Sequence, residues 1–188
     1  MIRWTARIAL LVLGAAGLAW TVDRWLGGRH RGDGPGALPD PIRSSTEIDA
    51  PIEQVWFRLA DIERQPDWMV DLKRVAIETS GPVRVGTRAN STVRILGIAV
   101  ADPVEVTEFL PPRRYAIRHE GAFHGTGVFQ LDALDNGRTG VTWDETLVPP
   151  ILPNLVSAAL APILGRVFQA DLERLAGQLE VESVAVIG

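Results

Sequence analysis

Residues 48–69 read IDAPIEQVWFRLADIERQPDWM and mark a change from a strand pattern to a helix pattern. Residues 44–49 alternate as a short strand does. Pro51 is tolerated in the first turn of a helix, and Asp49 can accept hydrogen bonds from the free N–H groups there. Apolar residues then recur at helical spacing as far as Pro66, which ends or redirects the helix. The stretch therefore predicts one short strand followed by an amphipathic helix.

After Lys73 the period of the apolar pattern changes to two residues, which is typical of strands. Six strand-like runs follow, at residues 73–79, 87–95, 98–109, 113–120, 123–134 and 139–148. Turn-forming residues separate these runs, and the Asp135-Asn136-Gly137 break is a strong hairpin signal. Together with the strand before the helix, the sequence predicts seven strands.

A long helical pattern follows Pro153 and runs to Leu179. Its second half, from Arg166 onward, is amphipathic, whereas its first half is apolar on nearly all sides. A helix that is apolar all round is buried or contacts another apolar surface. Because Pro162 and Gly165 fall in the middle of the pattern, we expect a kink or a break there.

Four further stretches accompany residues 48–69, namely VGTR (85–88), VTEFLPPRRYAIR (106–118), GRTGVTW (137–143) and LERLAGQLE (172–180). Together they resemble the START-like superfamily, also called SRPBCC, in its polyketide cyclase/dehydrase-like and lipid-transfer branch. The resemblance covers residues 44–180 and implies an α+β helix-grip fold. In that fold a seven-stranded antiparallel sheet wraps around a long C-terminal helix and leaves an apolar cavity. We expect residues 42–188 to form this domain.

The N-terminal segment contains an uncharged apolar run at residues 8–22, preceded by Arg3 and Arg7. The run alone is shorter than the ~30 Å hydrocarbon core of a membrane, but a helix over residues 4–26 can cross it. The tryptophans of this segment are suited to the membrane interfaces. We therefore expect residues 1–26 to be a single transmembrane-like anchor helix. A cleaved signal peptide and a buried helix of the domain are the alternatives.

Residues 27–41 are rich in Gly and Pro, a composition typical of a linker. The sequence thus predicts a single-pass membrane protein with the domain outside the cytoplasm. Its basic residues are almost all Arg, with Lys73 the only Lys, which suggests a GC-rich bacterial genome and hence a bacterial cell membrane. Its expected partners are the membrane, through residues 4–26, and a hydrophobic small molecule or lipid.

The composition excludes several other classes of protein. The 188 residues include 19 Lys and Arg and 23 Asp and Glu, a net charge of −4, so a nucleic-acid partner is not expected. Cys is absent, and the three His do not have the spacing of metal ligands. The sequence also lacks a P-loop, a dinucleotide-binding motif and a nucleophile elbow. We therefore predict no metal site, no cofactor and no catalytic residue assigned by a motif.

Alternation along the strands assigns residues to the cavity. His119 shares the face of Tyr115 and Ile117, and Glu145 shares the face of Trp143. We expect these two ionisable groups to pair inside, unless a one-residue bulge turns Glu145 to the solvent. The predicted cavity residues are Trp56, Trp68, Met69, Phe109, Tyr115, Ile117, His119, Phe123, Phe129, Leu131, Trp143, Glu145, Ile163, Val167 and Phe168.

The expected function is the binding of an apolar small molecule or lipid in this cavity, by a membrane-anchored carrier, sensor or presenter. One alternative is a polyketide cyclase/dehydrase-like enzyme in which His119 and Glu145 act as general acid and base. The other is a docking module for another membrane protein, with an exposed apolar patch in place of a cavity. For Trp56, Phe129 and Trp143, plain core packing is the alternative to ligand contact.

Overall fold

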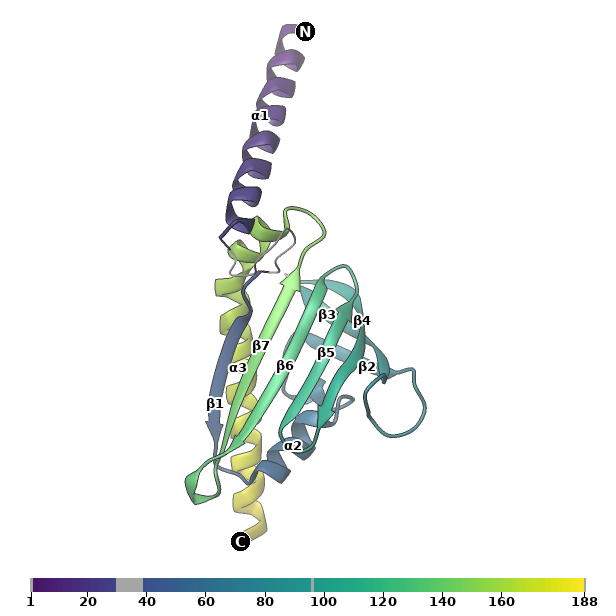
Figure 1. The fold of residues 1–188 in the computed structure, drawn as a ribbon, viewed down its shortest axis with the longest axis vertical. Helices are drawn as coiled ribbons and strands as arrows, with labels where there is room; N and C mark the ends of the chain where they lie inside the picture. The colour runs from purple at the N-terminus through teal and green to yellow at the C-terminus, as the bar shows by residue number, and fades with distance from the viewer. Residues whose placement is uncertain (1, 30–38, 96, 188) are drawn as a thin grey trace.

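The computed structural model describes residues 2–29, 39–95 and 97–187, and the side chains of residues 12, 14–29, 39–94 and 97–181. The helices are α1 (Ile2–Gly27), α2 (Ile52–Ala60) and α3 (Pro153–Ile187). The strands are β1 (Ile42–Ile48), β2 (Leu72–Ile77), β3 (Arg88–Ile95), β4 (Ile98–Leu110), β5 (Arg114–Glu120), β6 (His124–Ala133) and β7 (Thr139–Val148). Figure 1 shows the strands side by side, with α3 running along one face of the sheet and α1 extending beyond the domain.

The strands form one antiparallel sheet in the order β1-β7-β6-β5-β4-β3-β2. From β2 to β7 each strand pairs with the next one in the chain. The first strand, β1, instead pairs with β7, from Ile42 opposite Glu145 to Ile48 opposite Thr139. The seven-stranded antiparallel sheet and the long C-terminal helix confirm the predicted α+β helix-grip fold.

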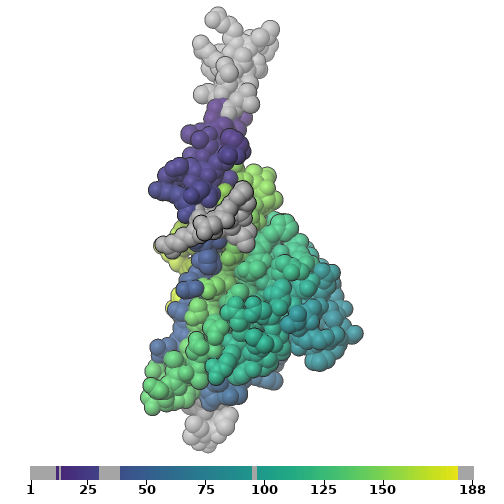
Figure 2. Space-filling model, viewed as in Figure 1, coloured from purple at the N-terminus to yellow at the C-terminus, as the bar shows by residue number. Residues whose placement is uncertain are grey.

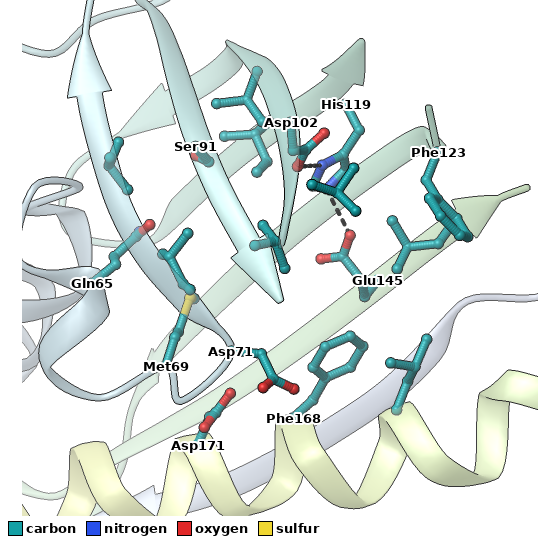
Figure 3. A pocket seen from close by; sticks show the side chains of 18 of the residues that line it. Gln65, Met69, Asp71, Ser91, Asp102, His119, Phe123, Glu145, Phe168 and Asp171 are labelled. Carbon is teal, nitrogen blue, oxygen red and sulfur yellow. Dashed lines mark hydrogen bonds and ion pairs between the residues drawn. The ribbon is translucent and has the colours of Figure 1, made fainter. Parts of the chain in front are cut away.

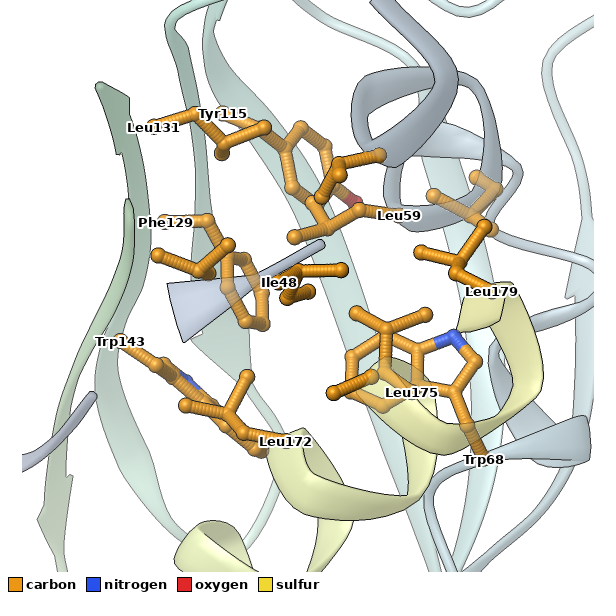
Figure 4. Close-up of a cluster of buried hydrophobic side chains, with 14 of the residues drawn as sticks. Ile48, Leu59, Trp68, Tyr115, Phe129, Leu131, Trp143, Leu172, Leu175 and Leu179 are labelled. Carbon is orange, nitrogen blue, oxygen red and sulfur yellow. The ribbon is translucent and has the colours of Figure 1, made fainter. Parts of the chain in front are cut away.

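The hydrophobic core fills the part of the domain where α2 and the second half of α3 cover the sheet (Figure 4). Leu172, Leu175 and Leu179 recur every three or four residues, so α3 presents them on one face. Trp68 is fully buried beside them, and its ring meets that of Phe129 edge-on, with the centroids 6.2 Å apart. This packing fixes the second half of α3 against the sheet.

The first half of α3 is less buried, and Ile163 is 47% exposed. Within the described ranges, Pro153–Val181 is the helix that is long and apolar enough to cross a membrane by length and composition, and 11% of its apolar window is buried. The break predicted at Pro162 and Gly165 is absent, because α3 continues as one helix through both residues. Proline removes one backbone hydrogen bond, and the turns on either side are long enough to hold the helix together.

The end of α1 is joined to the start of α3 by Asp23, which is 7% exposed. Its Oδ1 accepts the backbone N–H groups of Asn154 and Leu155, both at 2.9 Å. Its Oδ2 accepts the side-chain amide of Asn154 at 3.2 Å. The first N–H groups of a helix have no partner within that helix, so Asp23 caps α3 from a different helix. Contacts between side chain and backbone therefore fix the end of α1 to the domain.

The segment predicted to be an anchor is helical, and its insertion in a membrane stays a prediction. The side chains of residues 2–11 and 13 lie outside the described residues. Residues 30–38 of the predicted linker lie outside them as well.

Candidate functional site

A cavity of about 200 Å³ lies between the sheet and α3. Its walls are mostly apolar, with Val104, Val106 and Ile117 contributed by the sheet and Leu160 and Leu164 by the first half of α3. A curved sheet and a single helix cannot fill all the space between them, so a cavity remains where α3 is least buried.

Eleven of the fifteen residues predicted for the cavity line it. They are Met69, Tyr115, Ile117, His119, Phe123, Phe129, Trp143, Glu145, Ile163, Val167 and Phe168. Their contact with a ligand stays a prediction. The other four lie elsewhere: Trp68 and Leu131 are fully buried in the core, and the ring of Trp56 packs on Phe109 with the centroids 5.3 Å apart. Alternation identifies the inward face of an element, but the position along the element decides whether that face meets core or cavity.

His119 lies between two carboxylates on the cavity wall (Figure 3). Its Nδ1 is 2.7 Å from Asp102 Oδ2 on β4, and its Nε2 is 2.7 Å from Glu145 Oε1 on β7. The second contact is an ion pair, and neither His119 Nε2 nor Glu145 Oε1 has a hydrogen-bond partner among the described residues. Trp143 donates its Nε1–H to the other oxygen of Glu145, at 2.8 Å. The pair predicted from the sequence is therefore present, and Asp102 is an additional member of the group.

The contact between His119 and Glu145 passes over β6, which separates their strands. The β6 partner of His119 is Gly125, and the β6 partner of Glu145 is Gly127. A Cβ atom on Gly127 would lie 2.6 Å from Glu145 Oε2, so any other residue there would displace the carboxylate. The register between β6 and β7 has no shift and Glu145 is 4% exposed, so the bulge considered for it is absent.

The charge of His119 follows from this arrangement. Burial lowers the pKa of the imidazole, but the charges of Glu145 and Asp102 and the contacts they make outweigh burial and raise that pKa to about 10. His119 is therefore an imidazolium at neutral pH, with one ring nitrogen within 2.7 Å of each carboxylate. In this state it can donate a proton or a hydrogen bond, but it cannot act as a general base.

We expect the stability of the domain to fall as the pH rises from neutral. The pKa of His119 is about 10 in the folded protein and about 6.5 when unfolded. The contribution of protonated His119 to the free energy of unfolding is therefore complete below pH 6.5 and is lost as the pH rises through 10. Urea unfolding at a series of pH values from 6 to 10 measures this loss. The His119→Gln variant should lack that part of the pH dependence. An equal decline in both proteins would contradict the raised pKa.

Asp71 and Asp171 form a second polar region of the wall, beside Met69 (Figure 3). Asp171 is 3% exposed, and its Oδ1 accepts the backbone N–H of Val70 at 3.0 Å and an Arg174 N–H at 2.8 Å. Burial is the main cause that raises the pKa of Asp171, and the charge of Asp71 adds to it, whereas the two hydrogen bonds act in the opposite direction. The cavity therefore has acidic groups in two places.

Sequence analysis did not identify Asp71, Asp102 or Asp171 as cavity residues. For Asp102 a signal exists, because it lies two residues before Val104 on the same face of β4. The other two lie on the segment before β2 and on α3, and their position depends on how α3 packs against the sheet.

A second cavity, of about 210 Å³, adjoins the first. The residues that line both are Phe123, Glu145, Leu147, Leu160 and Leu164. Its other walls include Pro39 and Asp40 before β1 and Ser157 near the start of α3, so it lies at the α1 end of the domain. Figure 2 shows α1 standing out from this end. Glu145 therefore lies at the boundary between the inner cavity and the space near α1.

The chain is similar in fold to several solved structures. The Zhui aromatase/cyclase from Streptomyces sp. R1128 is 21% identical, with a TM-score of 0.60 over 74% of this chain and 93% of that one. The jhp0584 protein from Helicobacter pylori is 18% identical, with a TM-score of 0.64 over 77% and 90%. A START superfamily protein from Mycobacterium smegmatis is 18% identical, with a TM-score of 0.55 over 72% and 99%.

Among curated proteins, none matches this chain in sequence. A family model described as polyketide cyclase / dehydrase and lipid transport matches residues 41–180. The match begins just before β1 and ends within α3, so it includes all the strands and the helix that line the cavity.

Proposed function

Because the chain belongs to the polyketide cyclase / dehydrase and lipid transport family, we propose that it binds an apolar small molecule or lipid between the sheet and α3. The observation that supports this proposal is the cavity of about 200 Å³ with mostly apolar walls. Removing the apolar surface of a ligand from water drives binding in such a cavity. A protein of this kind acts as a carrier, a sensor or a presenter of its ligand.

The group formed by Asp102, His119 and Glu145 on the cavity wall is better suited to ligand binding than to catalysis. A cyclase or dehydrase-like reaction needs a general acid and a general base beside the substrate. His119 can supply the acid, but Glu145 already contacts His119 and accepts the Trp143 N–H. The docking alternative calls for an exposed apolar patch in place of a cavity, so the cavity favours ligand binding over docking.

We also propose that α1 holds the domain at a bacterial cell membrane as a single-pass anchor, with the domain outside the cytoplasm. Trp20 and Trp25 are 58% and 57% exposed, and the guanidinium groups of Arg24 and Arg29 lie 4.9 and 3.9 Å from their ring centroids. Exposed tryptophans beside arginines are typical of a membrane interface. Anchoring would keep the cavity at a high effective concentration of a lipophilic ligand.

Membrane fractionation tests the anchor. The full chain should sediment with membranes and resist extraction with alkaline carbonate, because an apolar helix is retained by the bilayer. A chain that starts at Leu38 should stay in the supernatant and serves as the control. Release of the full chain by carbonate, or a mature N-terminus near Trp20, would contradict the anchor and favour a cleaved signal peptide.

Filling the cavity tests ligand binding. Ser91 is 6% exposed and faces the cavity from β3, whereas the next residue, Thr92, points to the other face of the sheet. Ser91→Trp should weaken the binding of a neutral hydrophobic dye by about ten-fold or more, because the indole occupies the space that a ligand would use. Thr92→Trp should bind the dye as the unchanged chain does. Fluorescence titration of the full chain in lipid nanodiscs, with empty nanodiscs as the blank, measures both.

Equal dye binding by the two tryptophan variants would place the dye outside the cavity and contradict the proposal. Failure of the unchanged chain to bind any of a set of neutral lipids and aromatic dyes would contradict it as well.

A further inference from the structure

The charged groups around the inner cavity are unequal in sign. Four carboxylates line it, from Asp71, Asp102, Glu145 and Asp171. The cationic side chains that line it, as far as the described residues extend, are His119 and Arg94. Arg94 is exposed, so water screens its charge more strongly than it screens the buried groups. Acidic side chains therefore outnumber cationic ones on the wall that a ligand meets.

Among these carboxylates, Glu145 is a buried one with an oxygen atom that accepts no hydrogen bond from the described residues. Asp171 receives two N–H donors, one of them from the cationic Arg174. The side chain of Asp102 is 18% exposed and reaches water. The side chain of Glu145 is 5% exposed, and its Oε2 accepts the Trp143 N–H at 2.8 Å. Its Oε1 lies 2.7 Å from His119 Nε2 but accepts no hydrogen bond from the described residues.

The positive charge of His119 is shared between two carboxylates. One imidazole lies between two carboxylates, so the group holds more acidic than basic side chains within a mostly apolar wall. A buried charge without compensation is unfavourable, and a cation or a hydrogen-bond donor that reaches it relieves the cost.

We propose that the ligand of this cavity is a lipophilic amine, whose apolar body contacts the walls and whose ammonium group lies beside Glu145. This inference rests on the proposed function, because it names the class of ligand for the same cavity. Glu145 is also the polar residue that both cavities share, so an ammonium group there can direct the apolar body either inward or toward α1. A fatty acid is disfavoured, because its carboxylate would meet a wall of the same charge.

Three ligands of one chain length test this proposal, namely octylamine, octan-1-ol and octanoic acid at pH 7. The amine is protonated and the acid is ionised at this pH, so the three differ mainly in the charge of the head group. Binding to the full chain in lipid nanodiscs is measured by equilibrium dialysis against empty nanodiscs. We expect the amine to bind about ten-fold or more tightly than the acid, with the alcohol between them.

Two matched glutamate variants locate the effect. Glu145→Gln should abolish most of the preference for the amine over the alcohol, because the amide carries no charge. Glu47→Gln should leave the preference unchanged, since the side chain of Glu47 is 59% exposed on β1. The ratio of two affinities within one variant does not depend on the folded fraction, so it remains informative if Glu145→Gln is less stable.

Each other outcome decides against the proposal in a different way. Octanoic acid binding as tightly as octylamine would overturn it while leaving the proposed function intact. Asp171→Asn could instead abolish the preference while Glu145→Gln retains it. That result would place the ammonium group beside Asp71 and Asp171 and overturn the role of Glu145. If none of the three ligands binds and Ser91→Trp has no effect on dye binding, the proposed function fails together with this inference.

Discussion

Replacing His119 or Glu145 with alanine is expected to lower the free energy of unfolding by about 3–5 kcal/mol each, the usual cost of leaving one partner of a buried ion pair alone. The two groups are 2.7 Å apart, and their side chains are 11% and 5% exposed. The double variant should lose less than the sum of the two single losses, because each substitution removes the charge that the other leaves unpaired. Urea unfolding of the full chain at pH 7, followed by tryptophan fluorescence, gives all three values.

An exposed ion pair provides the control for this double-mutant cycle of His119 and Glu145. Glu47 Oε2 lies 2.6 Å from Arg138 Nη1, and the two side chains are 59% and 44% exposed. Such a pair contributes less than about 1 kcal/mol, so Glu47→Ala should change the stability little. Strict additivity of the His119 and Glu145 losses would mean that the two groups do not interact in solution.

The second large effect is expected at Trp68, which is fully buried in the core. Its ring meets those of Phe129 and Trp143 edge-on, with centroids 6.2 and 6.4 Å apart. Trp68→Ala should lower the free energy of unfolding by about 3–5 kcal/mol, because it leaves a cavity that the core cannot close completely. The same urea measurement checks this value.

Trp68→Phe should retain most of the stability. The indole Nε1–H of Trp68 is buried and makes no hydrogen bond with the part of the chain that the structure describes, so phenylalanine removes an unsatisfied donor along with some volume. Because Trp68 does not line the cavity, dye affinity should be unchanged in this variant. A loss of stability as large as that of Trp68→Ala would show that the indole group itself is needed.

The strands could be predicted closely because their signals are local. The two-residue period and the turn residues depend only on neighbours in the chain. The prediction for β7, residues 139–148, agrees with Thr139–Val148, and the one for β4 ends at Phe109, one residue before the strand does. The same alternation placed His119 and Glu145 on inward faces, and from there their pairing could be predicted without knowledge of the glycines between them.

The division of inward residues between core and cavity could not be predicted in this way. Trp68 and Trp143 are both inward, yet only Trp143 lines the cavity, because α3 packs closely on one part of the sheet and loosely on the other. That difference depends on the course of a helix more than 80 residues after Trp68. The contact of Asp23 with α3 has no local signal either, since a single Asp near a helix end is common on protein surfaces.

The cap that Asp23 places on α3 also has a consequence for the order of folding during synthesis. The residues it joins are 131 positions apart, and Arg43 of β1 meets Asp144 of β7 across 101 positions. At about 5–20 residues per second, a ribosome needs on the order of ten seconds to make the partners of α1 and β1 after those elements have emerged. During this interval β2 to β6 can pair in turn, while β6 remains an open edge and β1 has no strand to pair with. The domain can therefore close only after β7 and α3 have been made and reach the elements that were made first.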